Sequence, residues 1–502
     1  MNILLDTNII IPLEDTNKVL NASFAELRRL AVEQRHCLYV HPMQLADINR
    51  DKDQKRKKIV LSRLNQYSKI DNPPILSYEE CAALGLSNSN DNDKVDNNVL
   101  FALYRGAVHL LVTNDEGIHK KASKIGIQDK VYRLEQFLDF LRKYSNSPIS
   151  YSYTGVQDRY MYEIDKKQSF FDSLRQAYDG FNRWYQNCAE QQRKCWCIED
   201  DKGNVAAICI YKLENDTSLT NDGKIVKGSI LKLCTFKVEA QARGKKLGER
   251  LLYIAFDYCV KNDIDWVYLH TFEQKTLVSL CEDYGFYNLG KYKHDDVYIK
   301  PMRLKNENLD SLDSLIRYYP YFQDDDAVQK FIVPIRPKYH EDLFPDFSNL
   351  KGSLFESDQN LYSCQGNTIK KAYLCHSKIK TIKKGDVLMF YRSHDRKSIQ
   401  CMGIVEEVFF SEYIDEVFPV ISKRTVYTYA DLIEILKQKT LVILFRFIAL
   451  DKEIPLKSIV SAGIEGNIQS IRKISNEQYN VTRCALLFFE KSYSYYETNS
   501  YI

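Results

Sequence analysis

Short apolar runs alternate with amphipathic segments along the first 143 residues of the chain. Apolar runs bounded by polar residues are typical of buried strands, whereas apolar residues repeated every three or four positions are typical of helices. The predicted strands are residues 2–5, 37–40, 109–113 and 131–134. The predicted helices are residues 24–30, 98–104 and 134–144. Alternation of strands and helices indicates a parallel sheet with helices on its faces.

Two further blocks follow, and the polar segments 145–148 and 305–326 mark the boundaries between blocks. The second block, 150–304, has predicted strands at 194–198, 205–212, 230–238, 266–271 and 297–300, and predicted helices at 168–190, 247–261 and 275–284. The third block, 327–495, has predicted strands at 372–375, 387–391, 401–406, 440–449 and 485–489, a turn at 385–386, and predicted helices at 429–438 and 465–473. We therefore expect a multidomain α/β protein with a parallel sheet, a mixed α/β sheet and a small β-barrel with helices.

Composition supports this organisation and restricts the function classes. A chain of 502 residues is too long for a single core. A net charge of +3 excludes a strong overall attraction to nucleic acid, so any basic surface has to be local. The sequence has neither an apolar run that could cross a bilayer nor a signal-peptide pattern at its start, so we expect no membrane association.

The 13 cysteines are scattered and form no CxxC pair. This usage indicates free thiols in a reducing compartment, so we expect a cytoplasmic protein. Cys195 and Cys197 have the tightest spacing. On a strand the two side chains share one face, and we interpret them as core residues and not as metal ligands.

Carboxylates follow two of the predicted strands in the first block. Asp6 comes directly after strand 2–5, and Asp115 ends the polar triplet after Val112. The carboxyl ends of neighbouring parallel strands meet at one edge of a sheet, where open α/β sheets bind ligands. Asp47 and Asp96 lie on predicted helices between these strands. Since Mg²⁺ and Mn²⁺ prefer oxygen ligands, we predict a divalent-metal site that cleaves phosphodiesters.

The order and spacing of these acids make residues 1–145 similar to PIN-domain ribonucleases. The segments that carry the resemblance are Leu4-Leu5-Asp6-Thr7-Asn8, His41-Pro42-Met43-Gln44-Leu45-Ala46-Asp47, Asp96 with its helix, and Leu111-Val112-Thr113-Asn114-Asp115. The resemblance implies a metal-dependent endoribonuclease in which Asp6 and Asp96 bind the metal directly. Asp47 and Asp115 are expected as further ligands or as residues that orient water, and Asn8 or Thr113 as their hydrogen-bond partners. PIN domains often pair, so the resemblance also implies a homodimer.

Alternatives remain open for each of these residues. The second acid of the family is commonly Glu, so Asp47 has a shorter reach, and Asp93 competes with Asp96 as a ligand. Asp6 and Asp115 could instead cap the helices that follow them, because Asp is a favoured N-cap residue. The basic run 51–58 either contacts RNA phosphates or forms a solvated helix face.

Residues 231–252 combine an apolar strand, a basic turn that contains glycine, and an amphipathic helix. Backbone N–H groups and the dipole at such a helix N-terminus hold pyrophosphate. Arg243, Gly244 and Gly248 fit the Arg/Gln-x-x-Gly-x-Gly pattern, with Lys246 in place of its first glycine, so the segment resembles motif A of GNAT acyltransferases. The resemblance implies acetyl-CoA as the CoA thioester and assigns cofactor binding to Phe236, Val238, Arg243, Gly244, Lys245, Lys246, Leu247 and Gly248.

Residues 280–286 resemble the Tyr-x-x-x-Gly-Phe helix end of the same family. Cys281 stands where many members carry the tyrosine that protonates the departing thiolate. Tyr284 is the nearest substitute, unless its side chain points into the core. Glu239 and Glu273 are the candidate bases that take a proton from the amine. The alternative is a generic strand-turn-helix unit with a cation-rich surface.

The third block resembles the PUA-like group of small barrels that includes ASCH and EVE domains. The segments concerned are 366–377, 382–393 and 402–406. The resemblance implies binding of RNA or a modified base, for which aromatic side chains among cations are suited. The candidate contact residues are Lys370, Lys371, Tyr373, His376, Tyr391, Arg392 and Ser393. Alternatively, the two tyrosines pack within strands, and His376 is a satisfied turn residue.

Three functions are consistent with these patterns. The first is a toxin-like fusion of a Mg²⁺- or Mn²⁺-dependent ribonuclease with a CoA-dependent N-acetyltransferase, which acts on RNA or tRNA and has an antitoxin or another protein partner. The second keeps only the acetyltransferase active, with the other two blocks as binding modules. The third is a non-catalytic nucleic-acid-binding regulator, which the departures at Lys246 and Cys281 favour.

Overall fold

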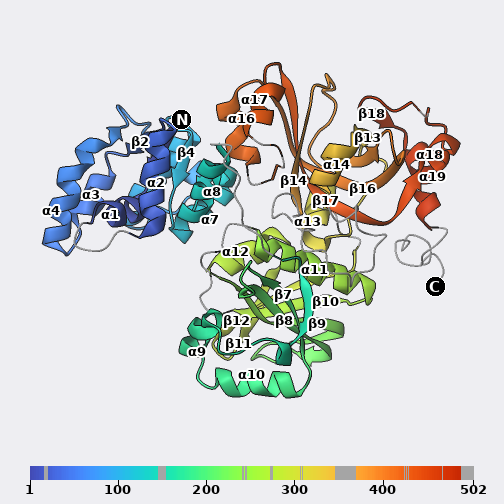
Figure 1. Cartoon of the computed structure of the whole chain (residues 1–502), viewed down its shortest axis with the longest axis horizontal. Helices are drawn as coiled ribbons and strands as arrows, with labels where there is room; N and C mark the ends of the chain where they lie inside the picture. Colours follow the sequence, from blue (N-terminus) through green and yellow to red (C-terminus); the bar gives the residue numbers. More distant parts are fainter. Residues whose placement is uncertain are drawn as a thin grey trace.

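The computed structural model describes residues 1–15, 21–144, 154–239, 242, 246–271, 275–305, 307, 309–344, 369–422, 424–425, 427, 429–465 and 467–487. Within these residues the strands form three sheets, one in each block of the sequence. Figure 1 shows an N-terminal module (1–144), a middle module (154–303) and a C-terminal module (327–487). The predicted multidomain α/β class is confirmed, with one parallel and two mixed sheets. The described strands of the C-terminal module, for which we predicted a small barrel, form a mixed sheet that ends at β14 (Lys370–Cys375) and β18 (Arg472–Ile474).

The N-terminal module contains a five-stranded parallel sheet of order β3-β2-β1-β4-β5. Its strands are β1 (Asn2–Leu5), β2 (Cys37–Val40), β3 (Ser68–Lys69), β4 (Leu110–Val112) and β5 (Val131–Tyr132). Its α-helices are α1 (Thr7–Glu14), α2 (Ala22–Glu33), α3 (Gln44–Asn49), α4 (Gln54–Arg63), α5 (Tyr78–Ala83), α6 (Asp91–Tyr104), α7 (Glu116–Lys124) and α8 (Leu134–Tyr144). The chain leaves β1 for β2 on one side and later places β4 on the other side. The switch point of this doubly wound order therefore lies between β1 and β4.

The middle module contains a seven-stranded mixed sheet of order β11-β12-β10-β9-β8-β7-β6. Its strands are β6 (Gln157–Tyr160), β7 (Lys194–Glu199), β8 (Val205–Ser218), β9 (Ile225–Val238), β10 (Trp266–Thr271), β11 (Tyr287–Tyr292) and β12 (Asp295–Pro301). Its α-helices are α9 (Asp172–Ala177), α10 (Phe181–Glu190), α11 (Leu247–Lys261) and α12 (Lys275–Asp283). Cys195 and Cys197 are fully buried in one core cluster, so their prediction as core residues is confirmed.

The single helix predicted for residues 168–190 is wrong. Helices α9 and α10 are separate, and Gly180 between them has a φ of 85°. Helix α9 ends at Ala177, and the left-handed Gly180 turns the chain into α10, which glycine does without steric cost.

The C-terminal module contains a six-stranded sheet of order β14-β17-β16-β15-β13-β18, in which only the β13–β15 pairing is parallel. Its strands are β13 (Lys330–Ile335), β14 (Lys370–Cys375), β15 (Val387–Arg392), β16 (Ser398–Ser411), β17 (Thr440–Pro455) and β18 (Arg472–Ile474). The helices are α13 (Ser311–Tyr318), which precedes the module, and α14 (Pro337–Leu343), α16 (Ile414–Ile421), α17 (Tyr429–Ile435), α18 (Leu456–Ser461) and α19 (Asn476–Leu487). In the described part of the chain, the edge strands of this sheet are β14 and β18.

Two predictions near the end of this module are wrong. The helix predicted for 465–473 is not formed, and β18 begins at Arg472 instead. Residues 485–487 of the predicted strand 485–489 belong to α19, and the last two lie outside the described residues. Helix α19 starts at a capping box, in which the Gln478 amide donates to Ser475 Oγ and the Ser475 amide donates to Gln478 Oε1.

The C-terminal module packs against both other modules (Figure 1). Toward the N-terminal module, the rings of Phe140 and Phe418 lie 4.8 Å apart, and the Tyr132 hydroxyl donates to the Pro419 carbonyl at 2.5 Å. Toward the middle module, Met389 and Tyr391 share a buried cluster with residues of α11 and α12. The C-terminal sheet therefore joins the three modules. None of the described helices has the length and apolarity that a bilayer crossing requires.

Candidate functional site

Strands β9 and β10 of the middle module are paired over only part of their length. Their parallel register runs from Ile230–Trp266 to Leu233–Leu269, whereas β9 continues to Val238 and β10 to Thr271. The register between β8 and β9 shifts at Cys234, which leaves this residue without an opposite partner in the β8–β9 ladder. Such a bulge bends and twists its strand. The two parallel strands therefore diverge beyond Leu233.

Helix α11 begins just beyond the divergent end of β9. Lys246 precedes the helix with a φ of 60°, and its carbonyl accepts the Arg250 amide at 3.0 Å. The N–H groups of Leu247, Gly248 and Glu249 belong to the first turn, where helix geometry supplies no intrahelical acceptor. Together with the helix dipole, these groups favour an anion such as a phosphate.

Gly248 allows α11 to lie close to β9. A Cβ atom at this position would meet Leu280 Cδ2 at 3.0 Å, Phe236 Cε1 at 3.6 Å and Val238 Cγ2 at 3.7 Å. The structure thus brings together five residues predicted to bind the cofactor, namely Phe236, Val238, Lys246, Leu247 and Gly248. The other predicted residues of this loop, Arg243, Gly244 and Lys245, lie outside the described residues, as does the candidate base Glu273.

Tyr284 and Cys281 lie in the core and not at the surface. Tyr284 is 1% exposed, and the guanidinium of Arg446 lies 5.2 Å from its ring centre. Burial raises the pKa of the Tyr284 hydroxyl well above its usual value. Cys281 is fully buried in the same cluster, and burial raises the pKa of its thiol too. The pairing of Tyr284 with Arg446 places this candidate acid at the contact between the middle and C-terminal modules.

Gly285 explains the Tyr-Gly-Phe pattern at the end of α12. It has a φ of 82°, and a Cβ atom there would lie 2.2 Å from the Ile316 carbonyl oxygen. Both the left-handed backbone and the close approach exclude a side chain. The other predicted base, Glu239, is partly exposed just beyond β9, and its amide donates to the Ala206 carbonyl at 2.8 Å.

His270 is a functional candidate that the sequence analysis missed. It follows Leu269, the last residue of β10 that pairs with β9. Among the described residues, its Nε2 atom is buried and has no hydrogen-bond partner, while its ring stacks on Tyr292 at 5.1 Å. Burial, assisted by Lys232, lowers the pKa of His270 to about 4. The imidazole is therefore neutral at pH 7 and lies where the two strands diverge.

Two charged side chains, Lys232 and Glu214, lie within electrostatic range of His270. Tyr268 shares the face of His270, because alternate strand residues point the same way. The Tyr268 hydroxyl donates to Glu214 Oε2 at 2.6 Å, and Lys212 lies 2.7 Å from the other oxygen of this carboxylate. The sequence signal for this site is a histidine near the carboxyl end of an otherwise mainly apolar strand, close to the predicted cofactor strand.

Comparison with known proteins agrees with this geometry. Residues 159–286 match the family model described as Acetyltransferase (GNAT) family. They therefore form a GNAT acetyltransferase domain, which confirms this part of the sequence-based resemblance. No curated protein matches the chain.

Several solved structures align with about a third of the chain at TM-scores below 0.25, and they include proteins from three organisms. An ASCH protein from Zymomonas mobilis is 13% identical with a TM-score of 0.22, over 31% of this chain and 94% of its own. A putative acyl-CoA N-acyltransferase from Klebsiella pneumoniae is 16% identical with a TM-score of 0.21, over 30% and 98%. NAA60 from Arabidopsis thaliana is 17% identical with a TM-score of 0.23, over 29% and 96%. The class of the middle module rests on the family match alone.

The acids of the N-terminal module meet at the switch point between β1 and β4. Leu5 pairs with Val112, so Asp6 and Thr113 are neighbours at the carboxyl ends of these strands. Asp6 Oδ2 accepts hydrogen bonds from Thr113 Oγ1 at 2.6 Å and from Asn8 Nδ2 at 2.8 Å. Burial raises the pKa of Asp6, and the nearby carboxylate of Asp115 adds to this effect.

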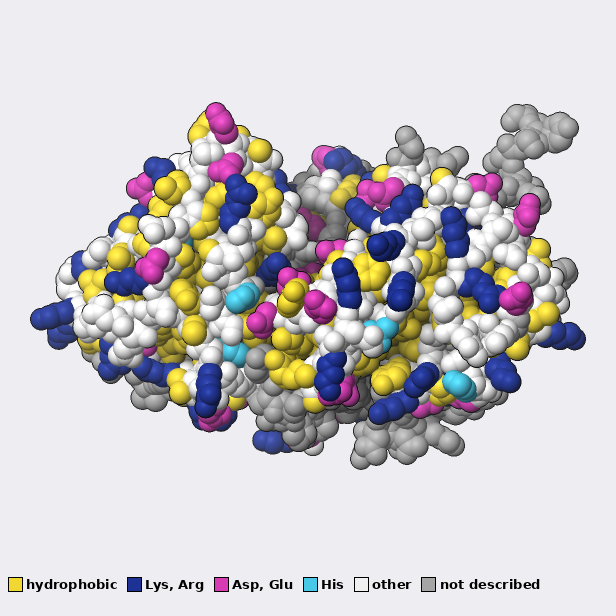
Figure 2. Space-filling model, turned by 90° about the horizontal axis from the view of Figure 1, so that it is seen from above, with side chains coloured by type: hydrophobic (Ala, Val, Ile, Leu, Met, Phe, Trp, Pro, Cys, Tyr) yellow, Lys and Arg dark blue, Asp and Glu magenta, His cyan; other side chains and the backbone are white. Residues whose placement is uncertain are grey.

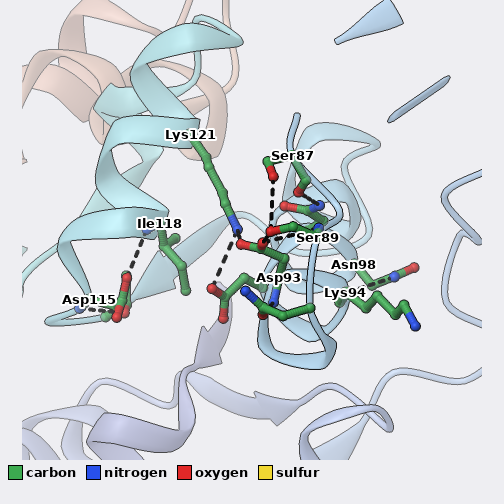
Figure 3. A network of polar contacts seen from close by, with 12 residues as sticks. Ser87, Ser89, Asp93, Lys94, Asn98, Asp115, Ile118 and Lys121 are labelled. Carbon is green, nitrogen blue, oxygen red and sulfur yellow. Dashed lines mark hydrogen bonds and ion pairs between the residues drawn. The ribbon is translucent and has the colours of Figure 1, made fainter. Parts of the chain in front are cut away.

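Asp96 on α6 joins this acidic group. Burial, together with the carboxylates of Asp6 and Asp115, raises its pKa to about 6 against the opposing effect of Lys121. Lys121 on α7 lies 3.5 Å from Asp96 and 2.9 Å from Asp93, toward which Figure 3 shows it extending. The three acids are thus within electrostatic range of one another. In the described residues, however, no three His, Cys, Asp or Glu side chains are arranged to hold a metal ion.

The capping roles of two acids are present as well. Asp6 Oδ1 accepts the Thr7 amide at 2.7 Å, and Asp115 Oδ1 accepts the Ile118 amide at 3.0 Å. Capping uses one oxygen of each carboxylate, and the other Asp6 oxygen accepts from Thr113 and Asn8, so a metal ion at Asp6 would have to share or displace these hydrogen bonds. Asp47 lies on α3 and forms an ion pair with Arg50. Nothing in its contacts links it to the other three acids.

The basic run 51–58 starts helix α4. Asp53 caps the helix by accepting the amides of Lys55 and Arg56, and the Arg56 guanidinium pairs with Asp51 at 2.6 Å. Lys55 and Lys58 are exposed. The helix-face interpretation accounts for this segment without RNA.

The structure contradicts the prediction that side chains of the C-terminal module form an exposed surface for nucleic acid. Lys371 is 1% exposed and donates to the Leu343 carbonyl at 2.7 Å, and Tyr373 donates to the Pro334 carbonyl at 3.0 Å. Tyr391 is buried between the modules, and Arg392 is buried in ion pairs with Asp395 and Glu341. Because these side chains are buried and bonded within the chain, they form no exposed stacking surface.

The remaining members of that set are also bound within the chain. The exposed His376 bonds the Ile435 carbonyl at 2.8 Å, and Ser393 Oγ donates to the Ile335 carbonyl at 3.0 Å. Lys370 contacts the middle module. Over the face shown in Figure 2, Lys and Arg side chains are interspersed with acidic and apolar ones, in keeping with the net charge of +3.

Proposed function

We propose that this protein is a CoA-dependent N-acetyltransferase that acts through its middle module. The observation that carries the proposal is the divergence of β9 from β10 beside the open first turn of α11, within residues that match the GNAT family. The first-turn N–H groups of Leu247 and Gly248 would hold the pyrophosphate of acetyl-CoA, with the Lys246 backbone leading into that turn. Phe236 and Val238 on β9 would lie along the pantetheine arm.

The residues near the divergence would orient the amine. Acetyl-CoA supplies the thioester, whose carbonyl carbon forms a C–N bond as its C–S bond breaks. The amine loses one proton in this step, and CoA leaves as the thiol. A neutral imidazole at His270 accepts a hydrogen bond from the amine through Nε2 and holds it beside the ends of the strands. Glu239 is the alternative acceptor of the proton.

The test uses the full chain with radiolabelled acetyl-CoA, total RNA, a protein mixture and small amines. We expect transfer of label to one of these acceptor classes, and loss of transfer when His270 is replaced by alanine. Absence of both transfer and acetyl-CoA binding would refute the proposal. Label on RNA would identify the toxin-like version of the function, and label on protein or a small amine would identify the acetyltransferase-only version.

A second function, metal-dependent RNA cleavage by the N-terminal module, is supported by the acids at the switch point. The Asp115 carboxylate raises the pKa of Asp6, and both raise the pKa of Asp96, so a cation between them would stabilise the group. Mg²⁺ or Mn²⁺ would provide that cation and activate a water molecule if Asp6, Asp96 and Asp115 rearranged around it, since the described side chains are not arranged as a ligand set. Manganese-dependent cleavage of total RNA that is lost in Asp6→Asn and Asp96→Asn would support this function. Equal cleavage by the variants would refute it and leave the module as a docking unit.

A further inference from the structure

Lys370, the first residue of β14, contacts three residues of the middle module. Its amide donates to Glu249 Oε1 at 3.0 Å, and its carbonyl accepts the Lys246 ammonium at 3.4 Å. Its own ammonium group donates to Asp283 Oδ2 at 3.0 Å. One residue of the C-terminal module thus holds both the start of α11 and the end of α12.

The position of Lys370 is fixed by the sheet to which it belongs. Its cross-strand partner on β17 is Arg446, which donates to the Asp283 carbonyl at 2.8 Å and to Glu406 at 2.8 Å. Arg446 is 3% exposed, so this contact is made in a buried environment where hydrogen bonds to charged groups are strong. The two strands therefore present a rigid pair of cations to the end of α12.

The carboxylate of Glu249 links the Lys370 contact to the proposed phosphate-binding turn. It lies in the first turn of α11 and is 8% exposed. A carboxylate there stabilises the helix dipole but repels a phosphate at the same N–H groups. The Lys370 amide binds one of its oxygens and so fixes the carboxylate on the side of the C-terminal module.

From these contacts we infer that the C-terminal module is a structural part of the acyl-CoA site, with Lys370 and Glu249 as positioning residues for the first turn of α11. The inference rests on the proposed acetyltransferase function. It assigns to this module the role of holding the phosphate-binding turn in place. The left-handed backbone of Lys246 costs strain energy, and the contact of its ammonium group with the Lys370 carbonyl helps to hold it in this conformation.

The experiment measures binding of acetyl-CoA and of acetyl-pantetheine, which lacks the pyrophosphate, to the full chain by titration calorimetry. The variants are Glu249→Ala, Lys370→Met and Lys370→Arg, with Lys380→Met as the control at an exposed lysine of the same module. We expect Glu249→Ala to bind acetyl-CoA about tenfold more weakly and acetyl-pantetheine unchanged. Lys370→Met keeps the backbone hydrogen bonds with Glu249 and Lys246 and loses only the ammonium contact with Asp283, so its loss of affinity should be smaller. Lys370→Arg restores the contact with Asp283 and most of the affinity.

The outcomes separate this inference from the proposed function. If Glu249 acted only as a charge beside the phosphate, Glu249→Ala would bind acetyl-CoA more tightly, which would overturn the inference. Unchanged affinity for acetyl-CoA in Glu249→Ala would overturn it as well. An equal loss for both ligands would show general unfolding of the site and would also count against it. Absence of acetyl-CoA binding by the unaltered chain would instead refute the acetyltransferase proposal itself.

Discussion

The ammonium group of Lys121 lies 3.5 Å from a carboxylate oxygen of Asp96. This contact lowers the pKa of Asp96, whereas burial and the repulsion from Asp6 and Asp115 raise it. The net result is a pKa raised to about 6. The positive charge of Lys121 therefore neutralises the negative charge of the three carboxylates only in part. A divalent ion at this position would compete with Lys121 for the same carboxylate.

The raised pKa of Asp96 predicts a stability that changes with pH. The unfolded chain loses this proton near the ordinary value of 3.8, whereas the folded chain keeps it up to about 6. Stability contributed by this group is thus present below about pH 4 and is lost as the pH rises to 6. We expect Asp96→Asn to raise the thermal midpoint at pH 7.5 and to leave it unchanged near pH 4.

The matched control is Asp91→Asn on the same helix, since the Asp91 side chain is 75% exposed. It should alter the midpoint little at either pH. A midpoint of Asp96→Asn that falls at pH 7.5 would mean that Asp96 stabilises the fold through its ion pair, and the acidic group would then need no cation.

Replacement of His270 tests the proposed amine site. His270→Ala should lower kcat by about 100-fold, because removal of a general base commonly costs 10²-fold or more. The KM for acetyl-CoA should not change, since the predicted CoA contacts lie on β9 and α11. His270 has a pKa of about 4, so its protonation should reduce the rate only as the pH falls toward that value.

His294→Ala on the neighbouring hairpin is the control, because His294 is exposed. Both variants should bind acetyl-CoA equally well. Full activity in His270→Ala would show that His270 is not the proton acceptor and would leave Glu239 as the candidate.

Gly285→Ala should destabilise the middle module strongly. The new Cβ atom would lie 2.2 Å from the Ile316 carbonyl oxygen, and the left-handed backbone adds about 1 to 2 kcal/mol of strain. Gly203→Ala is the matched control, since Gly203 has a φ of 78° with nothing within 4 Å of a Cβ atom. Thermal unfolding should show a clearly larger loss at position 285, and equal losses would contradict the predicted clash.

Glu406 connects two buried arginines of the C-terminal module. Burial alone would raise its pKa, but Arg424 and Arg446 hold it well below the usual value. Arg424 also contacts Asp129 of the N-terminal module at 3.2 Å. Glu406→Ala leaves these cations without their carboxylate and should cost about 3 kcal/mol.

The neighbouring Glu407→Ala is the control for this change, because Glu407 is exposed. Urea unfolding followed by probes in each module should show a loss of stability in Glu406→Ala alone. If that loss appeared in the C-terminal module but left the other two unchanged, the connection between modules through this carboxylate would be excluded.

Local patterns predicted most of the elements that position the sites. The bounds of β2, α8, α11 and β10 were predicted as they occur, because each is a strongly periodic or apolar run with clear polar ends. The position of the GNAT domain could also be predicted, since the turn before α11 and the Gly-Phe end of α12 are local features. Gly285 shows why, as its backbone and its close contact both demand glycine.

Contacts between modules could not be predicted from the sequence. Tyr373 and Tyr391 follow a pattern that suits base stacking equally well, and only packing against neighbouring elements shows that they are buried. Lys370 has the same sequence signature as a phosphate-binding lysine, but its partners are 87 to 124 positions away in the chain. His270 was missed because the importance of its place depends on where β9 leaves β10.

The central claim is that the middle module binds acetyl-CoA at the first turn of α11. Thermal unfolding of the full chain with increasing acetyl-CoA tests it most directly, because a ligand that binds only the folded state must stabilise it. We predict a midpoint that rises with acetyl-CoA concentration and a smaller rise with acetyl-pantetheine. A midpoint that stays constant up to millimolar acetyl-CoA would contradict the account.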